Sequence, residues 1–95
     1  MFYPMRDYTL RGFEKAKQRN KKYNAILSSN KTGKIYTVPF GDSRMEQYED
    51  KTGLGVYAMK NHKDPERRKL YRLRHSKDTK PGFYSPGYFS WHYLW

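Results

Sequence analysis

The sequence predicts a small single domain of the α+β class over its 95 residues. Three observations support this prediction: two β-prone runs joined by a glycine-containing turn, a basic helix that begins at a proline, and an aromatic-rich C-terminal segment. Scarce aliphatic residues and a formal net charge of +11 are typical of disordered chains. However, the chain holds 10 Tyr, 5 Phe and 2 Trp, and each buried ring removes roughly 150–250 Å² from water. We therefore expect an aromatic-rich fold that is marginally stable alone.

Residues 1–22 are predicted to form a basic N-terminal arm. Its second half, residues 11–22, carries six cationic side chains and one carboxylate. A short helix is expected around residues 10–19, because Phe13 and Ala16 share one face at helical spacing. The apolar stripe of that helix is thin, so its packing would be limited.

Residues 23–41 are predicted to form a β-hairpin. β-branched and aromatic side chains are enriched on either side of the connection at 29–34, in which Gly33 is expected to adopt a positive φ. Pro39 has no backbone N–H to donate, so the second strand must end there or lie at a sheet edge.

Residues 42–55 are predicted to form a loop, with a short helical turn near 44–48 as an option. This loop contains the main acidic patch of the chain, which consists of Asp42, Glu46, Glu49 and Asp50.

A basic helix is predicted over residues 64–76. Asp64 has the side chain of an N-cap, Pro65 suits the first helical position, and Glu66 lies near the positive end of the helix dipole. Leu70 and Leu73, with Tyr71 or Arg74 beside them, are expected to form a narrow apolar stripe that packs on the rest of the protein, with cationic side chains around it.

The aromatic tail, residues 83–95, contains too many rings for a solvated terminus, so we expect it to be buried. Ser85 and Pro86 resemble a cap and first helical residue, which favours a helix. The helix would align Tyr88, Trp91, His92 and Trp95. A strand, the alternative, would align Phe89, Trp91, Tyr93 and Trp95.

Two sets of residues are candidates for binding. Arginines on several turns of a helix suit forked contacts with phosphate, and lysines add positive charge. The candidate anion- or partner-binding residues are Arg67, Arg68, Arg72, Arg74, Lys15, Lys17, Arg19, Lys21 and Lys22. The candidate partner or packing anchors are Tyr88, Phe89, Trp91, Tyr93 and Trp95. Alternatively, the helix cations form a solvated face or meet the acidic loop of a neighbouring copy or partner.

The composition argues against several classes of site. Without cysteine there is no disulfide, thiol nucleophile or cysteine-based metal site. No glycine-rich phosphate loop of a nucleotide enzyme occurs, and His62, His75 and His92 follow no familiar zinc-ligand spacing. We predict no enzymatic activity, no catalytic residue, no metal and no cofactor. We also expect no signal peptide and no membrane span.

Several stretches share the pattern of one protein family, namely 8–15, 38–42, 50–55, 62–68, 71–72, 74–75 and 84–95. On these stretches the chain resembles small uncharacterised basic proteins of large double-stranded DNA viruses of protists and algae, and of some phages. That family has no assigned activity, so the resemblance implies a virion or virus-factory protein without supplying an active site.

The residues and the resemblance together predict a non-enzymatic structural protein, a minor capsid component of a large DNA virus. Its aromatic tail would insert into a groove of a coat protein, and its basic faces would meet acidic coat surfaces or packaged DNA. The expected location is the virion, and the host cytoplasm during assembly. Other coat proteins, DNA and a second copy of the chain are the partners considered. The alternative function is a nucleic-acid-binding accessory protein that contacts phosphates through its basic helix.

Overall fold

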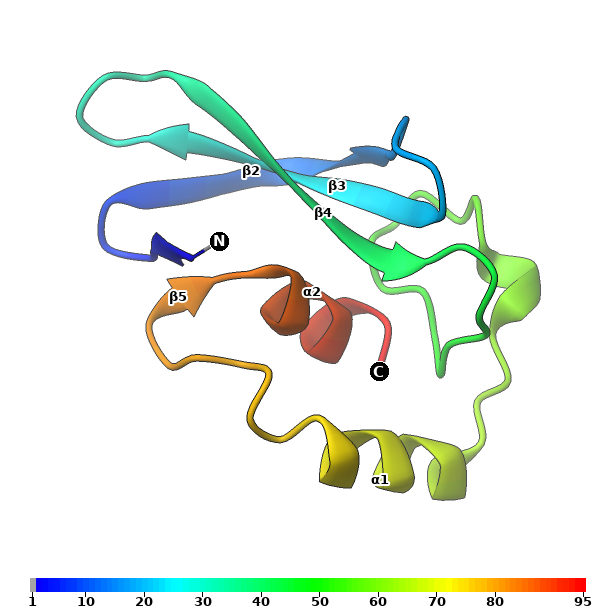
Figure 1. The fold of residues 1–95 in the computed structure, drawn as a ribbon. Helices are drawn as coiled ribbons and strands as arrows, with labels where there is room; N and C mark the ends of the chain where they lie inside the picture. The colour runs from blue at the N-terminus through cyan, green and yellow to red at the C-terminus, as the bar shows by residue number, and fades with distance from the viewer. Residues whose placement is uncertain (1) are drawn as a thin grey trace.

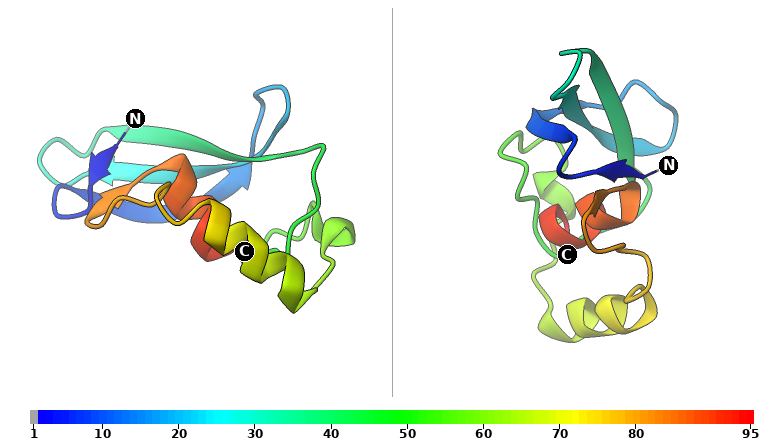
Figure 2. Two further views of the ribbon diagram at one scale, coloured as in Figure 1. Left: turned by 60° about the horizontal axis from the view of Figure 1, so that its bottom comes forward. Right: turned by 90° about the vertical axis from the view of Figure 1, so that its left-hand side faces the viewer.

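Three strands form a twisted antiparallel sheet in the order β2-β3-β4, which is one of three layers in this α+β domain (Figure 1). Helix α2 (Pro86–Tyr93) packs beneath the sheet, and helix α1 (Pro65–Arg74) lies on the opposite side of α2 (Figure 2). The computed structural model describes residues 2–95. The other elements are β1 (Tyr3–Pro4), β2 (Tyr8–Lys15), β3 (Lys21–Ser29), β4 (Ile35–Asp42), the 3₁₀ helix η1 (Ala58–Lys60) and β5 (Phe83–Tyr84).

The predicted β-hairpin is confirmed as strands β3 and β4. Gly33 in its connection has a φ of 74°, the left-handed conformation that the turn requires. Pro39 lies within β4, and β4 is an edge strand, so the missing N–H of Pro39 leaves no gap in the ladder with β3.

The predicted short helix near residues 10–19 is wrong, because residues 8–15 form strand β2. The pairing of β2 with β3 shifts register between Leu10 and Gly12, so Arg11 is an extra residue in a β-bulge. This bulge places Leu10 and Phe13 against the same core although they are three residues apart. The helix was predicted from Phe13 and Ala16, and their spacing of three arises here without a helix, because Phe13 packs on the core from β2 and Ala16 is buried where the following turn begins.

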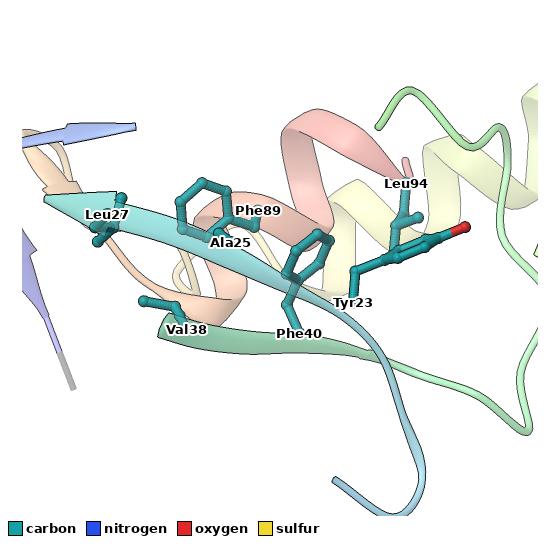
Figure 3. Packing of buried hydrophobic residues seen from close by; sticks show 7 residues of the cluster. All are labelled: Tyr23, Ala25, Leu27, Val38, Phe40, Phe89 and Leu94. Atoms are coloured by element: carbon teal, nitrogen blue, oxygen red, sulfur yellow. The ribbon is translucent and has the colours of Figure 1, made fainter. Parts of the chain in front are cut away.

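The core lies between the sheet and α2 (Figure 3). Directly paired residues of neighbouring strands face the same side, so Tyr23 opposite Phe40 and Ala25 opposite Val38 point together toward the helix. Phe89 of α2 is fully buried, and its ring centroid lies 5.5 Å from that of Phe40. The fold therefore depends on a few aromatic contacts rather than on many aliphatic ones.

Both predicted helix caps are confirmed. The Asp64 side chain accepts hydrogen bonds from the backbone N–H groups of Glu66 and Arg67 at the start of α1. The Ser85 hydroxyl accepts one from the N–H of Tyr88, so the tail is a helix and not a strand. Before this helix, β5 pairs with β1, so residues 83–84 lie beside residues 3–4 near the N-terminus.

Gly41 in β4 provides a test of this packing. Its φ is 76°, and an added Cβ would lie 2.9 Å from Leu94 Cδ1 and 3.2 Å from Lys22 Cβ. Gly33 has a similar φ but nothing within 4 Å of the added atom. We expect Gly33→Ala to lower the free energy of unfolding by about 1–2 kcal/mol through the backbone alone, and Gly41→Ala to cost at least about 1 kcal/mol more. Urea denaturation would measure both, and equal costs would contradict the packing.

Candidate functional site

The turn between β2 and β3 concentrates positive charge at one end of the sheet. We define the basic tip as the four exposed side chains of Lys15, Lys17, Arg19 and Lys21. Among residues 2–95, none of these four lies within ion-pair distance of a carboxylate. The nearest acid in sequence, Glu14, accepts a hydrogen bond from Asn24 Nδ2 at 3.0 Å on the neighbouring strand. Lys21 lies opposite Asp42 on β4 and helps to lower the pKa of that carboxyl, but no side chain of the tip forms a close ion pair, so most of its positive charge is available to a partner.

Backbone hydrogen bonds hold the basic tip in one conformation. Asn20 has a φ of 66°, and its carbonyl accepts a hydrogen bond from the N–H of Ser43 at 3.1 Å. The N–H of Ala16 donates to the carbonyl of Lys22, which closes the base of the turn. Because the backbone of the turn is already ordered, binding a partner costs only the conformational entropy of the four side chains.

Lys22, predicted to contact an external anion, is instead buried, with 1% of its surface exposed. Its ammonium group donates a hydrogen bond to Gln47 Oε1. Burial, with the positive charge of Lys60 as a second cause, lowers the pKa of Lys22 to about 8. Lys22 thus belongs to the interior of the protein and not to its basic surface.

Two arginines of α1 turn inward to aromatic rings of the same molecule. The guanidinium of Arg68 lies 4.2 Å from the ring centroid of Tyr48, and that of Arg72 lies 5.1 Å from the ring centroid of Trp91. Arg72 also donates a hydrogen bond to the carbonyl of Trp95 at 3.2 Å. Contacts of this kind are worth about 0.5–2 kcal/mol each, so these arginines attach the helix to the body.

The other two predicted arginines of α1 face outward. Arg67 donates a hydrogen bond to Glu46 Oε1 at 2.8 Å, which lowers the pKa of that glutamate. The helix thus contacts the acidic loop of its own chain, whereas the sequence predicted, as an alternative, such a contact with the loop of a neighbouring copy or partner. Arg74 is exposed, and no carboxylate of residues 2–95 pairs with it.

The aliphatic stripe predicted to attach α1 does not pack. Leu70 is 57% exposed and Leu73 is 70% exposed. The face that packs consists instead of Arg68, Tyr71 and Arg72, and the Tyr71 ring stacks on that of Trp95 at 4.3 Å with an interplanar angle of 4°. The helix therefore leaves apolar surface in solvent.

One side of the aromatic tail packs on the sheet. Phe89 is fully buried, and the Tyr88 ring lies 5.1 Å from it. The Tyr93 ring lies 4.6 Å from that of Phe13 on β2. Phe89 has no exposed surface to offer a partner, and Tyr88 and Tyr93 are half-buried.

The other side of the tail packs on α1. Trp91 carries Arg72 over its ring, and Trp95 stacks on Tyr71. His62 adds an edge to this layer, since its ring lies 5.2 Å from that of Trp95. The tail is thus apolar on two sides because it is the middle layer of the domain. Its rings pack against the sheet and α1 of the same chain, whereas the sequence predicted that they would insert into a groove of a coat protein.

A buried polar network centred on Gln47 was not expected from the sequence. The Gln47 side chain is fully buried, and its Nε2 donates to the carbonyl of Tyr57 at 2.8 Å and to Asn61 Oδ1 at 2.6 Å. The hydroxyl of Tyr23 donates to Asp50 Oδ2 at 2.5 Å. In the sequence, only the polar composition of the loop indicated such bonds. The short helical turn that was the option at 44–48 does not form.

The histidines make separate local contacts. His62 Nδ1 accepts a hydrogen bond from the N–H of Asp64, and His75 Nδ1 lies 2.5 Å from Asp78 Oδ2. Over residues 2–95, no group of three or more His, Asp or Glu side chains is placed to hold a metal ion. Within the same range, no helix is both long enough and apolar enough to cross a membrane.

No family model, curated protein or solved structure matches this chain. The resemblance to small basic proteins of large DNA viruses therefore stays a prediction.

The buried lysine predicts an unusual dependence of stability on pH. Lys22 titrates at about 8 in the native state but near 10.5 in the unfolded chain, so the unfolded state binds more protons between these values. The free energy of unfolding should therefore rise as the pH increases from about 8 to about 10. Burial raises the pKa of Tyr23 and of Tyr71 to about 12, and these two residues oppose the rise in stability only above about pH 10.

Urea denaturation at several pH values would measure this rise. Lys22→Met serves as the control, because it removes the titrating group whatever its own effect on stability. A wild-type slope equal to that of Lys22→Met would contradict the assignment.

Proposed function

We propose that this protein is a non-enzymatic nucleic-acid-binding protein that contacts phosphates through the basic tip. The observation that carries the proposal is the absence of carboxylate partners: of all the Lys and Arg side chains in residues 2–95, only Arg44 and Arg67 form ion pairs with acids. An unpaired cationic surface of this density attracts polyanions and releases counterions when it binds them.

The shape of the tip supports contacts to the phosphate backbone. Lysine and arginine side chains on a protruding turn can reach phosphates on a duplex, and such contacts carry no sequence information by themselves. We therefore expect binding that is salt-dependent and largely independent of sequence. If the resemblance to small basic proteins of large DNA viruses holds, the nucleic acid is the DNA of such a virus.

The basic tip predicts a specific loss of salt dependence. In the variant with Lys15, Lys17, Arg19 and Lys21 all replaced by Ala, affinity for duplex DNA should fall, and the slope of log affinity against log salt should shrink by about 0.9 for each lost phosphate contact. Fluorescence anisotropy with a labelled duplex at several salt concentrations would measure both quantities.

A charge-matched control separates the tip from overall charge. The exposed lysines Lys31, Lys34, Lys51 and Lys77 lie outside the tip, and their replacement by Ala removes the same net charge. The control should keep most of the wild-type slope. Equal losses in the two variants would show that binding follows net charge and not the tip.

A structural protein that joins coat proteins is the second candidate function. The observation that favours it is the exposed aliphatic surface of α1 at Leu70 and Leu73. Exposed apolar surface that is surrounded by charged residues is typical of protein-protein contacts. Quantitative mass spectrometry of purified particles, after removal of their DNA, would test it. A fixed copy number in the stripped shell would support this function, and loss with the DNA would support the first.

A further inference from the structure

A groove of about 610 Å³ lies between α1, the loop that follows β4 and the C-terminal end of α2. Its volume is in the range typical of ligand-binding pockets. Tyr71 and Trp95 contribute apolar surface, Leu94 lines the groove although it is almost fully buried, and all three are held by packing in the domain. The groove is therefore a consequence of how α1 rests on the aromatic tail, and its floor does not depend on a ligand.

Two aliphatic side chains also line the groove and remain in solvent. Leu70 of α1 is 57% exposed, and Met45 of the loop is 60% exposed. Burying either side chain against an apolar partner would be favourable, because it removes apolar surface from water. The groove thus offers apolar contact area that the fold leaves unused.

The side of the groove that α1 forms also carries positive charge. Arg67 and Arg74 are seven residues apart on α1, about 10 Å along its axis, and Leu70 lies on the same face between them. Arg74 has no carboxylate partner among residues 2–95. Arg67 uses one N–H group for Glu46, and a guanidinium has five. Both arginines can therefore accept a further anion.

The acidic residues of the groove do not offset this charge. Asp42 accepts two side-chain hydrogen bonds from Arg44, which hold its pKa below the usual range, and Glu46 is paired with Arg67. Both carboxylates are therefore ionised and already neutralised by cations of the same chain. An approaching acid meets the unpaired charge of Arg74, and it can accept hydrogen bonds from the free N–H groups of Arg67, whose charge Glu46 already balances.

We propose that this groove binds an acidic amphipathic helix of a partner protein. The occupant places two carboxylates about two helical turns apart opposite Arg67 and Arg74, and its apolar residues between them cover Leu70 and Met45. Because α1 presents a cation, an aliphatic residue and a cation in that order, the complementary order of acid, apolar and acid is what fits.

A nucleic acid fits this groove less well than a helix does. Phosphates would satisfy the arginines, but a sugar-phosphate backbone brings no aliphatic surface to cover Leu70, Met45 and the apolar floor. The groove and the basic tip adjoin at Lys21 and Asp42, but they offer different chemistry, which would let one molecule join a nucleic acid to an acidic protein.

The test uses a labelled helical peptide of about 20 residues with glutamates seven positions apart and leucines at the third and fourth positions between them. Fluorescence anisotropy with the full-length protein should give saturable binding. A scrambled peptide of the same composition should bind at least about tenfold more weakly, because it has the same charge but no apolar face.

Matched variants locate the binding surface. Leu70→Ser and Met45→Ser should each weaken peptide binding by about tenfold. Leu54→Ser and Met59→Ser change the same residue types at exposed positions outside the groove and should leave binding unchanged. All four side chains are largely exposed, so none of these changes should unfold the protein.

A charge reversal tests the arginines. Arg74→Glu should weaken binding of the peptide, and one of the two peptides that carry Lys in place of a single glutamate should restore it. The variant that lacks the basic tip should bind the peptide as the wild type does, which separates this proposal from the DNA-binding function.

Three outcomes would overturn the proposal. They are an absence of saturable binding, equal binding of the scrambled peptide, and complete displacement of the peptide from the tip-less variant by duplex DNA. The last of these would assign the groove to phosphate.

Discussion

The buried Gln47 side chain fixes the position of everything that follows the sheet. Its amide accepts from Lys22 on β3 and donates to Tyr57 and Asn61, so all of its N–H groups are used although none of it reaches solvent. A buried amide without partners costs roughly 1–3 kcal/mol, which makes any other arrangement of this loop unfavourable. The loop that Gln47 holds contains Met45 and Glu46, so the wall of the groove and the anchor of Arg67 both depend on this one residue.

The third layer of the domain has a different basis, since α1 has no buried residue. It is held by the stacking of Tyr71 on Trp95 and by the guanidinium groups of Arg68 and Arg72 over aromatic rings. A chain with few aliphatic residues can attach a helix in this way, because the planar guanidinium stacks on rings while its edge stays hydrated. As a consequence, Leu70 and Leu73 do not contribute to this packing and remain exposed.

Local chemistry made much of the fold predictable from the sequence. The caps at Asp64 and Ser85 and the turn at Gly33 each involve residues within a few positions of one another, and all three were predicted correctly. The failures share a different origin. Phe13 and Ala16 are buried or half-buried at helical spacing although no helix forms, and the register that reveals strand β2 is set by β3, a separate part of the chain.

The candidate site was less predictable for the same reason. Lys22 lies in a run of cations, and nothing in the neighbouring sequence indicates that it is buried. The residue that accepts its hydrogen bond, Gln47, is 25 positions away. Arg68 and Arg72 have the same helical spacing as an apolar stripe, but the choice between arginine and leucine as the packing face depends on what lies opposite. Here the tail presents aromatic rings, which favour the guanidinium groups.

The acidic residues explain why so much positive charge remains available. Asp64 caps a helix, Asp50 binds a tyrosine hydroxyl, and Glu14 binds an asparagine, so these carboxylates satisfy internal donors rather than lysines. A net charge of +11 on 95 residues destabilises a compact state through self-repulsion. A fold that commits its acids to internal structure and leaves its cations on a tip and along a groove gains stability whenever an external anion supplies the missing charge. The charge distribution thus makes the stability of this domain depend on the anions around it.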